Sequence, residues 1–515
     1  MWRNADSDSG ILIIDSSRLD ESRPGGQDST RISKVRNLMS QCLVVLVFNI
    51  VKFSSGTSLG FTVVLLGKFH NETTFEIPMS LAYQSWFGAY CFTGPVGAIA
   101  IAIVAHLIGS RTTLLLGSSL FVASWVIFYY ARSAAHLLIA QAIVGINIST
   151  ILGPGVAYVV EISQPNLRST FMATTNLSMI LGQFFTVLLN NWLHWRTIVL
   201  VNLAFPIVGL VSMFFFPESP HWLASKGKYE EAERSLAWLR GWATPEDVEV
   251  EFRLLRETQQ KSRKDLSTSS LTGRRRLANM FKLYVERSFY IPLAIICLTF
   301  LIQALVGSHT VQTFAIRLFK ILNSPLDKKM AGTIFDGLRI AGAIVCISTV
   351  HLLGRRKLMF FSLAAGAITY LMAAVSIHLT TRKYLEAEVY LYLPSVMIIA
   401  STFVFAAGLD KVVNMLNGEL FPSRFRNVGT GVGSFVGAVF SMIMSKQFLY
   451  MIDYMTIQGV FLFFGVMSAF GFVLLYRMIP ETEGKTLMEI EEHYAQARSF
   501  KDCEIQSKTQ VYRVA

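Results

Sequence analysis

Apolar runs of about 20 residues occupy most of this sequence, and one long polar stretch, residues 217–288, divides them into two sets. A run of that length crosses the ~30 Å hydrocarbon layer of a bilayer as an α-helix. Inside lipid, only helices and closed barrels satisfy every backbone hydrogen bond. Charged residues make up 16% of the chain, whereas soluble domains contain about 25%. We therefore predict an all-α, multi-pass membrane protein.

Six apolar runs lie on each side of the polar stretch, which predicts twelve transmembrane helices. The expected helices cover residues 41–66, 80–108, 112–131, 134–160, 170–192, 197–216, 289–318, 329–353, 357–380, 389–417, 427–450 and 456–478. The expected order is an N-terminal tail (1–38), a six-helix bundle (39–216), a central loop with short helices (217–288), a second bundle (289–479) and a C-terminal tail (480–515). An even number of crossings places both termini and the central loop on one side.

The distribution of Lys and Arg identifies that side as the cytoplasm. Near the helix ends these residues are about twice as frequent on the side of the termini, and cytoplasmic loops are enriched in both. The sequon Asn71-Glu72-Thr73 lies in the first loop on the opposite side, which predicts glycosylation at Asn71. We expect a plasma-membrane protein with both termini in the cytoplasm.

The net charge of +12 has the same explanation, so the lipid bilayer is an expected partner and nucleic acid is not. The five cysteines, at positions 42, 91, 297, 346 and 503, stand at no metal-ligand or disulfide spacing. The sequence also contains no recognisable pair of a nucleophile and a base. We therefore predict a protein that is not an enzyme and has no catalytic residues, metal or cofactor.

Three motifs occur twice, in the same order, at the ends of corresponding helices. The pairs are Gly109-Ser110-Arg111 with Gly354-Arg355-Arg356, Glu161 and Arg168 with Glu419 and Arg424, and Pro217-Glu218 with Pro480-Glu481. This repetition predicts two pseudo-symmetric halves related by an axis along the membrane normal.

The charges in these motifs predict a gate at the cytoplasmic end of the bundle. The candidate gate residues are Glu161, Arg168, Glu218, Arg355, Arg356, Glu419, Arg424 and Glu481. An Arg guanidinium can hold a carboxylate through two parallel bonds. Such pairs would form when the cytoplasmic mouth closes and separate when it opens. The alternative is that these residues are interfacial anchors that set only the topology.

Longer motifs resemble the sugar-porter family of the major facilitator superfamily. They are Pro217-Glu218-Ser219-Pro220-His221-Trp222-Leu223, Gly418-Glu419-Leu420-Phe421-Pro422 and Pro480-Glu481-Thr482-Glu483-Gly484-Lys485-Thr486. Residues 55–61 are similar to those of insect facilitated trehalose transporters. The resemblance covers about 36–494. It implies the major facilitator fold, in which two six-helix halves alternately expose a midplane sugar site.

The resemblance also implies where a small-molecule substrate binds. The family holds sugars with amides and aromatic side chains. In helix seven Gln303 keeps an amide, and His309 replaces an Asn. Asn176 in helix five replaces a Gln, and Asn414 in helix ten replaces a Trp. Arg339 in helix eight falls near a site Asn. These five residues are the candidate substrate-binding residues.

Charged residues inside helices eight and ten leave two interpretations open. Asp336 and Arg339 are one turn apart, and Asp410 precedes Lys411. A charge inside a membrane helix costs about 3 kcal/mol or more, so it faces a partner or water. These residues either form structural ion pairs or line a cavity that prefers an anionic solute.

Two further departures from the family concern coupling and pH. Ser58 and Gln141 stand where proton-coupled relatives carry an Asp and an Arg, which favours facilitated diffusion. His106 and His351 stand where the family's gate is acidic. Either acidification charges these imidazoles and loosens the gate, or they act as neutral hydrogen-bonding groups.

The predicted function is facilitative transport of a sugar-like solute, a hexose or trehalose, by alternating access. Two alternatives remain open at this point. One is a transporter of the same fold for another organic solute, such as an anion. The other is a protein that senses sugar without transporting it.

Overall fold

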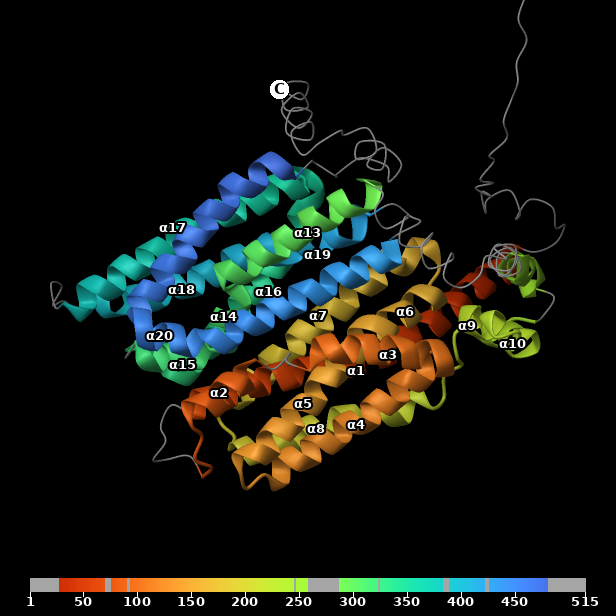
Figure 1. Cartoon of the computed structure of the whole chain (residues 1–515). Coiled ribbons are helices and arrows are strands. Elements are labelled where there is room, and N and C mark those ends of the chain that lie inside the picture. Colours follow the sequence, from red (N-terminus) through yellow and green to blue (C-terminus); the bar gives the residue numbers. More distant parts are fainter. Residues whose placement is uncertain are drawn as a thin grey trace, which may run out of the picture.

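The computed structural model describes residues 27–69, 76–89, 93–244, 247–257, 287–322, 325–382, 389–421 and 426–479. All regular secondary structure in these ranges is helical. The predicted sites Asn71, Arg424 and Glu481 lie outside them. The described helices form two bundles that lie side by side (Figure 1).

The N-terminal half is built around α1. This helix begins at Gln27, within the predicted tail, and ends at Phe69, close to the predicted end at residue 66. Its helices are α1 (Gln27–Phe69), α2 (Leu81–Gly88), α3 (Gly94–Ile108), α4 (Ser110–Tyr130), α5 (Ala134–Thr150), the π-helix η1 (Ile151–Gly155), α6 (Val156–Ile162), α7 (Pro165–Leu189) and α8 (Trp195–Met213). Two short helices of the central stretch follow, α9 (Pro220–Ser225) and α10 (Tyr229–Leu239). Residues 247–257 are also helical.

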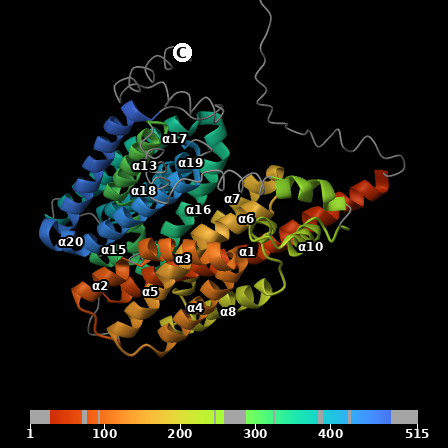
Figure 2. The same ribbon diagram turned by 45° about the vertical axis from the view of Figure 1, so that its right-hand side comes forward.

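The C-terminal half repeats this plan with different interruptions. Its helices are α13 (Arg287–Val306), α14 (Ser308–Thr313), α15 (Ala315–Ile321), α16 (Lys328–Leu353), α17 (Arg355–Thr381), α18 (Val389–Ala407), α19 (Leu409–Glu419) and α20 (Arg426–Met478). Turning the molecule by 45° keeps α2 beside α15, while α9 and α10 lie at the opposite end of the bundle (Figure 2). We call these the α2–α15 end and the α9–α10 end.

Ten helical stretches in the described ranges are long and apolar enough to cross a membrane. One of them, Val428–Met478, contains two crossings that meet at Thr456, where φ is +62°. The second predicted crossing corresponds to α2 and the apolar helix α3, which has only 15 residues. The described part of the chain therefore contains the twelve predicted crossings.

Three helices that the sequence predicted to be continuous are interrupted. The stretch 80–108 is divided between α2 and α3. The stretch 289–318 breaks at Gly307, whose φ of +75° is left-handed and ends α13. The stretch 389–417 breaks at Gly408 between α18 and α19. Periodicity did not reveal these breaks because it does not report the backbone conformation of the residues at which they occur.

The repeated glycines take the same conformation in both halves. Gly109 joins α3 to α4 with φ +98° and ψ 158°, and Gly354 joins α16 to α17 with φ +80° and ψ 156°. This region of backbone conformation is essentially restricted to glycine. The matched turns confirm that the two halves are structural repeats.

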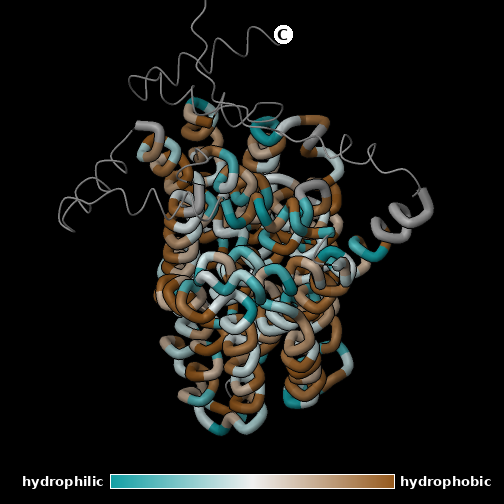
Figure 3. The backbone as a smooth tube through the Cα atoms, turned by 90° about the vertical axis from the view of Figure 1, so that its right-hand side faces the viewer, coloured by the Kyte–Doolittle hydropathy of each residue, from teal (hydrophilic) through white to brown (hydrophobic). Residues whose placement is uncertain are grey.

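Apolar side chains cover the outside of the bundle, as expected of a surface in contact with lipid. Val96, Phe215 and Phe361 are 70–76% exposed. Hydrophilic residues concentrate toward the interior and at the helix ends (Figure 3). The polar interior is therefore the place to look for a solute site.

Candidate functional site

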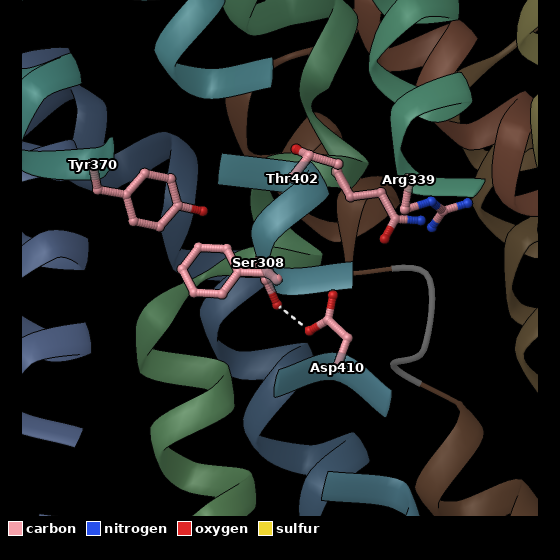
Figure 4. A pocket seen from close by; sticks show the side chains of 7 residues that line it. Ser308, Arg339, Tyr370, Thr402 and Asp410 are labelled. Carbon is pink, nitrogen blue, oxygen red and sulfur yellow. Dashed lines mark hydrogen bonds between the residues drawn. The ribbon is translucent and has the colours of Figure 1, made fainter. Parts of the chain in front are cut away.

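A pocket lies in the C-terminal half next to the breaks in helices seven and ten (Figure 4). Its lining residues are Ser308, Gln312, Arg339, Tyr370, Thr402, Phe405 and Asp410. They come from α14, α16, α17, α18 and α19. Hydroxyls and an amide alternate here with two aromatic rings, and two charges of opposite sign complete the lining. Such a surface can bind several hydroxyls of a solute and one flat apolar face.

Asp410 accepts hydrogen bonds from two neutral donors on the neighbouring broken helix. The Ser308 hydroxyl donates to Asp410 Oδ1 at 2.7 Å, and Gln303 Nε2 donates to the same oxygen at 3.2 Å. Gln303 Nε2 also lies 3.3 Å from His309 Nε2. Asp410 and Ser308 reach each other because Gly408 and Gly307 stand just before them, at the breaks. In Figure 4 Tyr370 lies on one side of this bond and Arg339 on the other.

A second polar cluster connects the pocket to the N-terminal half. Arg339 Nε lies 3.5 Å from Asp336 Oδ1, which is the ion pair that the one-turn spacing suggested. The Gln183 amide on α7 donates to that same Asp336 oxygen at 3.3 Å. Gln312 Nε2 in turn donates to Gln183 Oε1 at 2.7 Å. Gln183 thus connects the two halves at the level of the pocket.

Three of the five predicted substrate-binding residues belong to these two clusters, namely Gln303, His309 and Arg339. The other two do not. The Asn414 amide is exposed and donates to the backbone oxygen of Asp410 at 2.9 Å. Asn176 is exposed on α7, and it is Gln183 on that helix that contacts the C-terminal half.

The lining residues that the sequence prediction missed share one recognisable signal. Ser308, Gln312 and Thr402 are polar side chains inside apolar helices, as are Gln183 and Asp410. Buried polar groups are costly unless they are paired or face a cavity. That signal marks many residues in this chain, so it does not identify which of them meet.

Several contacts join the halves at the α2–α15 end. The Lys320 ammonium of α15 donates to the Gly67 carbonyl of α1 at 2.6 Å. The buried Arg317 guanidinium of α15 donates to the Gln84 side chain of α2. The main apolar core also contains residues of both halves. A separate apolar cluster toward the α9–α10 end consists of residues from the N-terminal half and α10. These contacts close the bundle at its α2–α15 end.

In the N-terminal half, predicted gate residues bind partners within that half. Glu218 accepts hydrogen bonds from the backbone N–H groups of Arg111, at 2.8 Å, and Thr112, at 3.1 Å. It therefore caps the free N–H groups at the start of α4. Glu161 accepts a hydrogen bond from the Ser219 hydroxyl, and Arg168 is exposed.

In the C-terminal half, the described gate residues also have partners within that half. Arg355 pairs with Glu419 at 2.8 Å. Arg356 donates to the Tyr476 carbonyl at 2.8 Å and lies over the Tyr476 ring. The opening and closing of these pairs remains a prediction.

Of the two candidate pH-sensitive histidines, the structure describes the side chain of His106 only. The His106 side chain is exposed, and its backbone carbonyl accepts a hydrogen bond from Trp222 Nε1 at 3.2 Å. His351 lies in α16, but its side chain is not among those that the structure describes. The pH-sensitive gate therefore stays a prediction.

Comparisons with characterised proteins agree with this architecture. The "Facilitated trehalose transporter Tret1" of Apis mellifera ligustica is 24% identical over 460 residues, which is 88% of each chain. The "Sugar transporter ERD6" of Arabidopsis thaliana is 26% identical over 445 residues, or 86% of this chain and 83% of that protein.

Solved structures and a family model give the same assignment. The inward open structure of the xylose transporter XylE from E. coli superimposes with a TM-score of 0.67 at 17% identity. The match covers 87% of this chain and 98% of that one. The likeness establishes the major facilitator fold. The family model described as "Sugar (and other) transporter" matches residues 39–494. This chain is therefore a member of the sugar (and other) transporter family, and so a multi-pass membrane transporter rather than an enzyme.

Proposed function

We propose that this protein moves a sugar-like solute, a hexose or trehalose, down its gradient across the plasma membrane by alternating access. The observation that carries the proposal is the polar pocket beside the two helix breaks, which Gln183 joins to the other half. The names of the trehalose and plant sugar transporters among its relatives support this solute class.

The arrangement of contacts supports an alternating mechanism. Contacts between the halves occur at the pocket and at the α2–α15 end. The described gate pairs at the α9–α10 end lie within single halves. If the α2–α15 end faces outward, this state is closed toward the outside. Breaking the α2–α15 contacts and joining the gate residues across the halves would produce the opposite state.

Uptake of labelled glucose and trehalose into proteoliposomes tests the proposed function. We expect saturable uptake of at least one sugar that stops at equal concentrations inside and outside. Collapsing a proton gradient should not change the rate of sugar uptake, because Ser58 and Gln141 replace the residues expected for proton coupling. Measurable sugar binding without flux would instead indicate a sensor. If the protein neither bound nor transported either sugar, the proposal would be refuted.

The orientation has a separate test at Asn71, which lies between α1 and α2 in the sequence. Both termini in the cytoplasm would place this loop outside the cell, where it can be glycosylated. In a secretory host we expect glycosidase to lower the apparent mass of the wild type. Asn71→Gln should already have the lower mass, and glycosidase should not change it. A glycosylated Asn71→Gln variant, or a wild type labelled by antibody at an extracellular terminus, would contradict this topology.

A further inference from the structure

Three cationic side chains come from different helices, and one of them, that of Arg339, lines the pocket. They are Lys52 of α1, Arg339 of α16 and Lys411 of α19, and we call them the cationic centre. Lys411 lies within electrostatic range of Arg339, and Lys52 lies within range of Lys411. The centre therefore spans the junction, because Lys52 belongs to the N-terminal half and the other two to the C-terminal half.

Arg339 retains hydrogen-bonding capacity beyond its pair with Asp336. Its side chain is only 12% exposed and contributes to the pocket lining. Its Nε and Nη2 atoms have no hydrogen-bond partner among the described residues, although Nε lies 3.5 Å from Asp336. Burying unsatisfied guanidinium N–H groups is costly, and an acceptor in the pocket would remove that cost.

The cost of burial is greater for Lys52, because its side chain is completely buried. Its Nζ has no hydrogen-bond partner among the described residues. Among the described residues, Lys52 interacts electrostatically with the like charge of Lys411 on the opposite half. Placing two ammonium groups near each other at this depth opposes the approach of the halves.

The acids among the described residues nearby do not balance these cations. Asp336 is paired with Arg339. The Oδ1 atom of Asp410 already accepts hydrogen bonds from Ser308 and Gln303. Three cationic side chains and two acidic ones give a formal excess of one positive charge.

We propose that the cationic centre binds the anionic group of an acidic sugar, a hexose that carries a carboxylate or a phosphate. The inference rests on the proposed function and names the solute class of the same pocket. Lys52 would approach the anion from one half, and Lys411 and Arg339 from the other, through charge-assisted hydrogen bonds. Ser308, Gln312 and Thr402 offer partners to the sugar hydroxyls.

This arrangement links binding to the movement of the halves. Without an anion, Lys52 and Lys411 repel each other across the junction. An anion between them converts the repulsion into two attractions, so the halves can close around the bound solute. The ligand then favours the closed state because it interacts with that state more strongly.

Uptake of four labelled solutes into proteoliposomes tests the inference: glucose, glucuronate, glucose 6-phosphate and malate. We expect wild-type protein to take up glucuronate, glucose 6-phosphate or both in preference to glucose. In Lys52→Met and Lys411→Met, the ratio of acidic-hexose uptake to glucose uptake should fall at least about tenfold. Lys52→Arg, which keeps the charge, should retain a ratio closer to that of the wild type.

Arg132→Gln is the matched control, because it also removes one positive charge but from an exposed position between α4 and α5. It should leave the ratio unchanged. Size-exclusion chromatography of each variant verifies that it is folded, and the ratio itself cancels differences in the amount of active protein.

The outcomes separate this inference from the proposed function. Glucose or trehalose uptake without acidic-hexose uptake would overturn the inference and leave sugar transport standing. Acidic-hexose uptake with an unchanged ratio in both lysine variants would overturn the role of the cationic centre. Malate uptake without uptake of any sugar would overturn both.

Discussion

Gly88→Val is expected to slow sugar uptake by roughly 5- to 150-fold. Gly88 ends α2, and a Cβ atom there would lie 2.4 Å from Phe314 Cζ in the other half. The Phe314 ring is fully buried and packs 4.9 Å from the Phe448 ring, so it has little room to move. Overpacking of this kind costs about 1–3 kcal/mol. The cost applies only to the state in which the halves meet at the α2–α15 end, and every transport cycle must pass through that state.

The second substitution Phe314→Ala provides the control. It removes the ring that valine would strike, so the double variant should recover much of the lost uptake. Phe314→Ala alone leaves a cavity and is expected to lower thermal stability. Wild-type uptake by Gly88→Val would mean that transport does not require this contact. A double variant as slow as the single one would mean that the slowing does not arise from the clash with Phe314.

Alanine at Gly109 or Gly354 is expected to destabilise the purified protein by about 1–3 kcal/mol each, because both glycines occupy a backbone region that other residues rarely enter. The larger loss is expected at Gly109. A Cβ atom there would lie 2.5 Å from Glu218 Oε2 and would displace the carboxylate that caps α4. The measurement is the midpoint of thermal unfolding in detergent.

Gly418→Ala is the matched control for this comparison. Gly418 lies within α19, and a Cβ atom there would have no neighbour within 4 Å among the residues that the structure describes. Alanine also favours helix over glycine, so this variant should unfold at or slightly above the wild-type midpoint. Equal midpoints for Gly109→Ala, Gly354→Ala and Gly418→Ala would show that the two repeated turns carry no conformational constraint.

The sequence predicted the fold well because the bilayer leaves few choices. The long apolar runs are helical, three of them with an interruption, and the repeated Gly109 and Gly354 form matching turns. Helix boundaries were less accurate where a helix extends past its apolar run, as α1 does by beginning at Gln27 rather than at residue 41. The breaks at Gly307 and Gly408 were missed, because a glycine inside an apolar run fits a continuous helix equally well.

The candidate site was only partly predictable. Gln303, His309 and Arg339 were identified by resemblance, and they lie in the polar clusters. Helix five shows where this approach failed. The resemblance pointed to Asn176, whereas Gln183, about two turns further along, contacts Asp336 and Gln312. Both amides are plausible in sequence, and only the rotation and height of α7 against the other half distinguish them.

The sequence alone determined that the chain crosses a membrane twelve times in two repeated halves, since backbone groups in lipid must be satisfied within helices. Only the tertiary structure decided which polar residues meet. A membrane helix is apolar toward lipid and toward its neighbours, so it lacks the amphipathic pattern that orients a helix in a soluble protein. The electrostatic interaction of Lys52 with Lys411, which is far away in the sequence and of like charge, could not be predicted from the sequence around either residue.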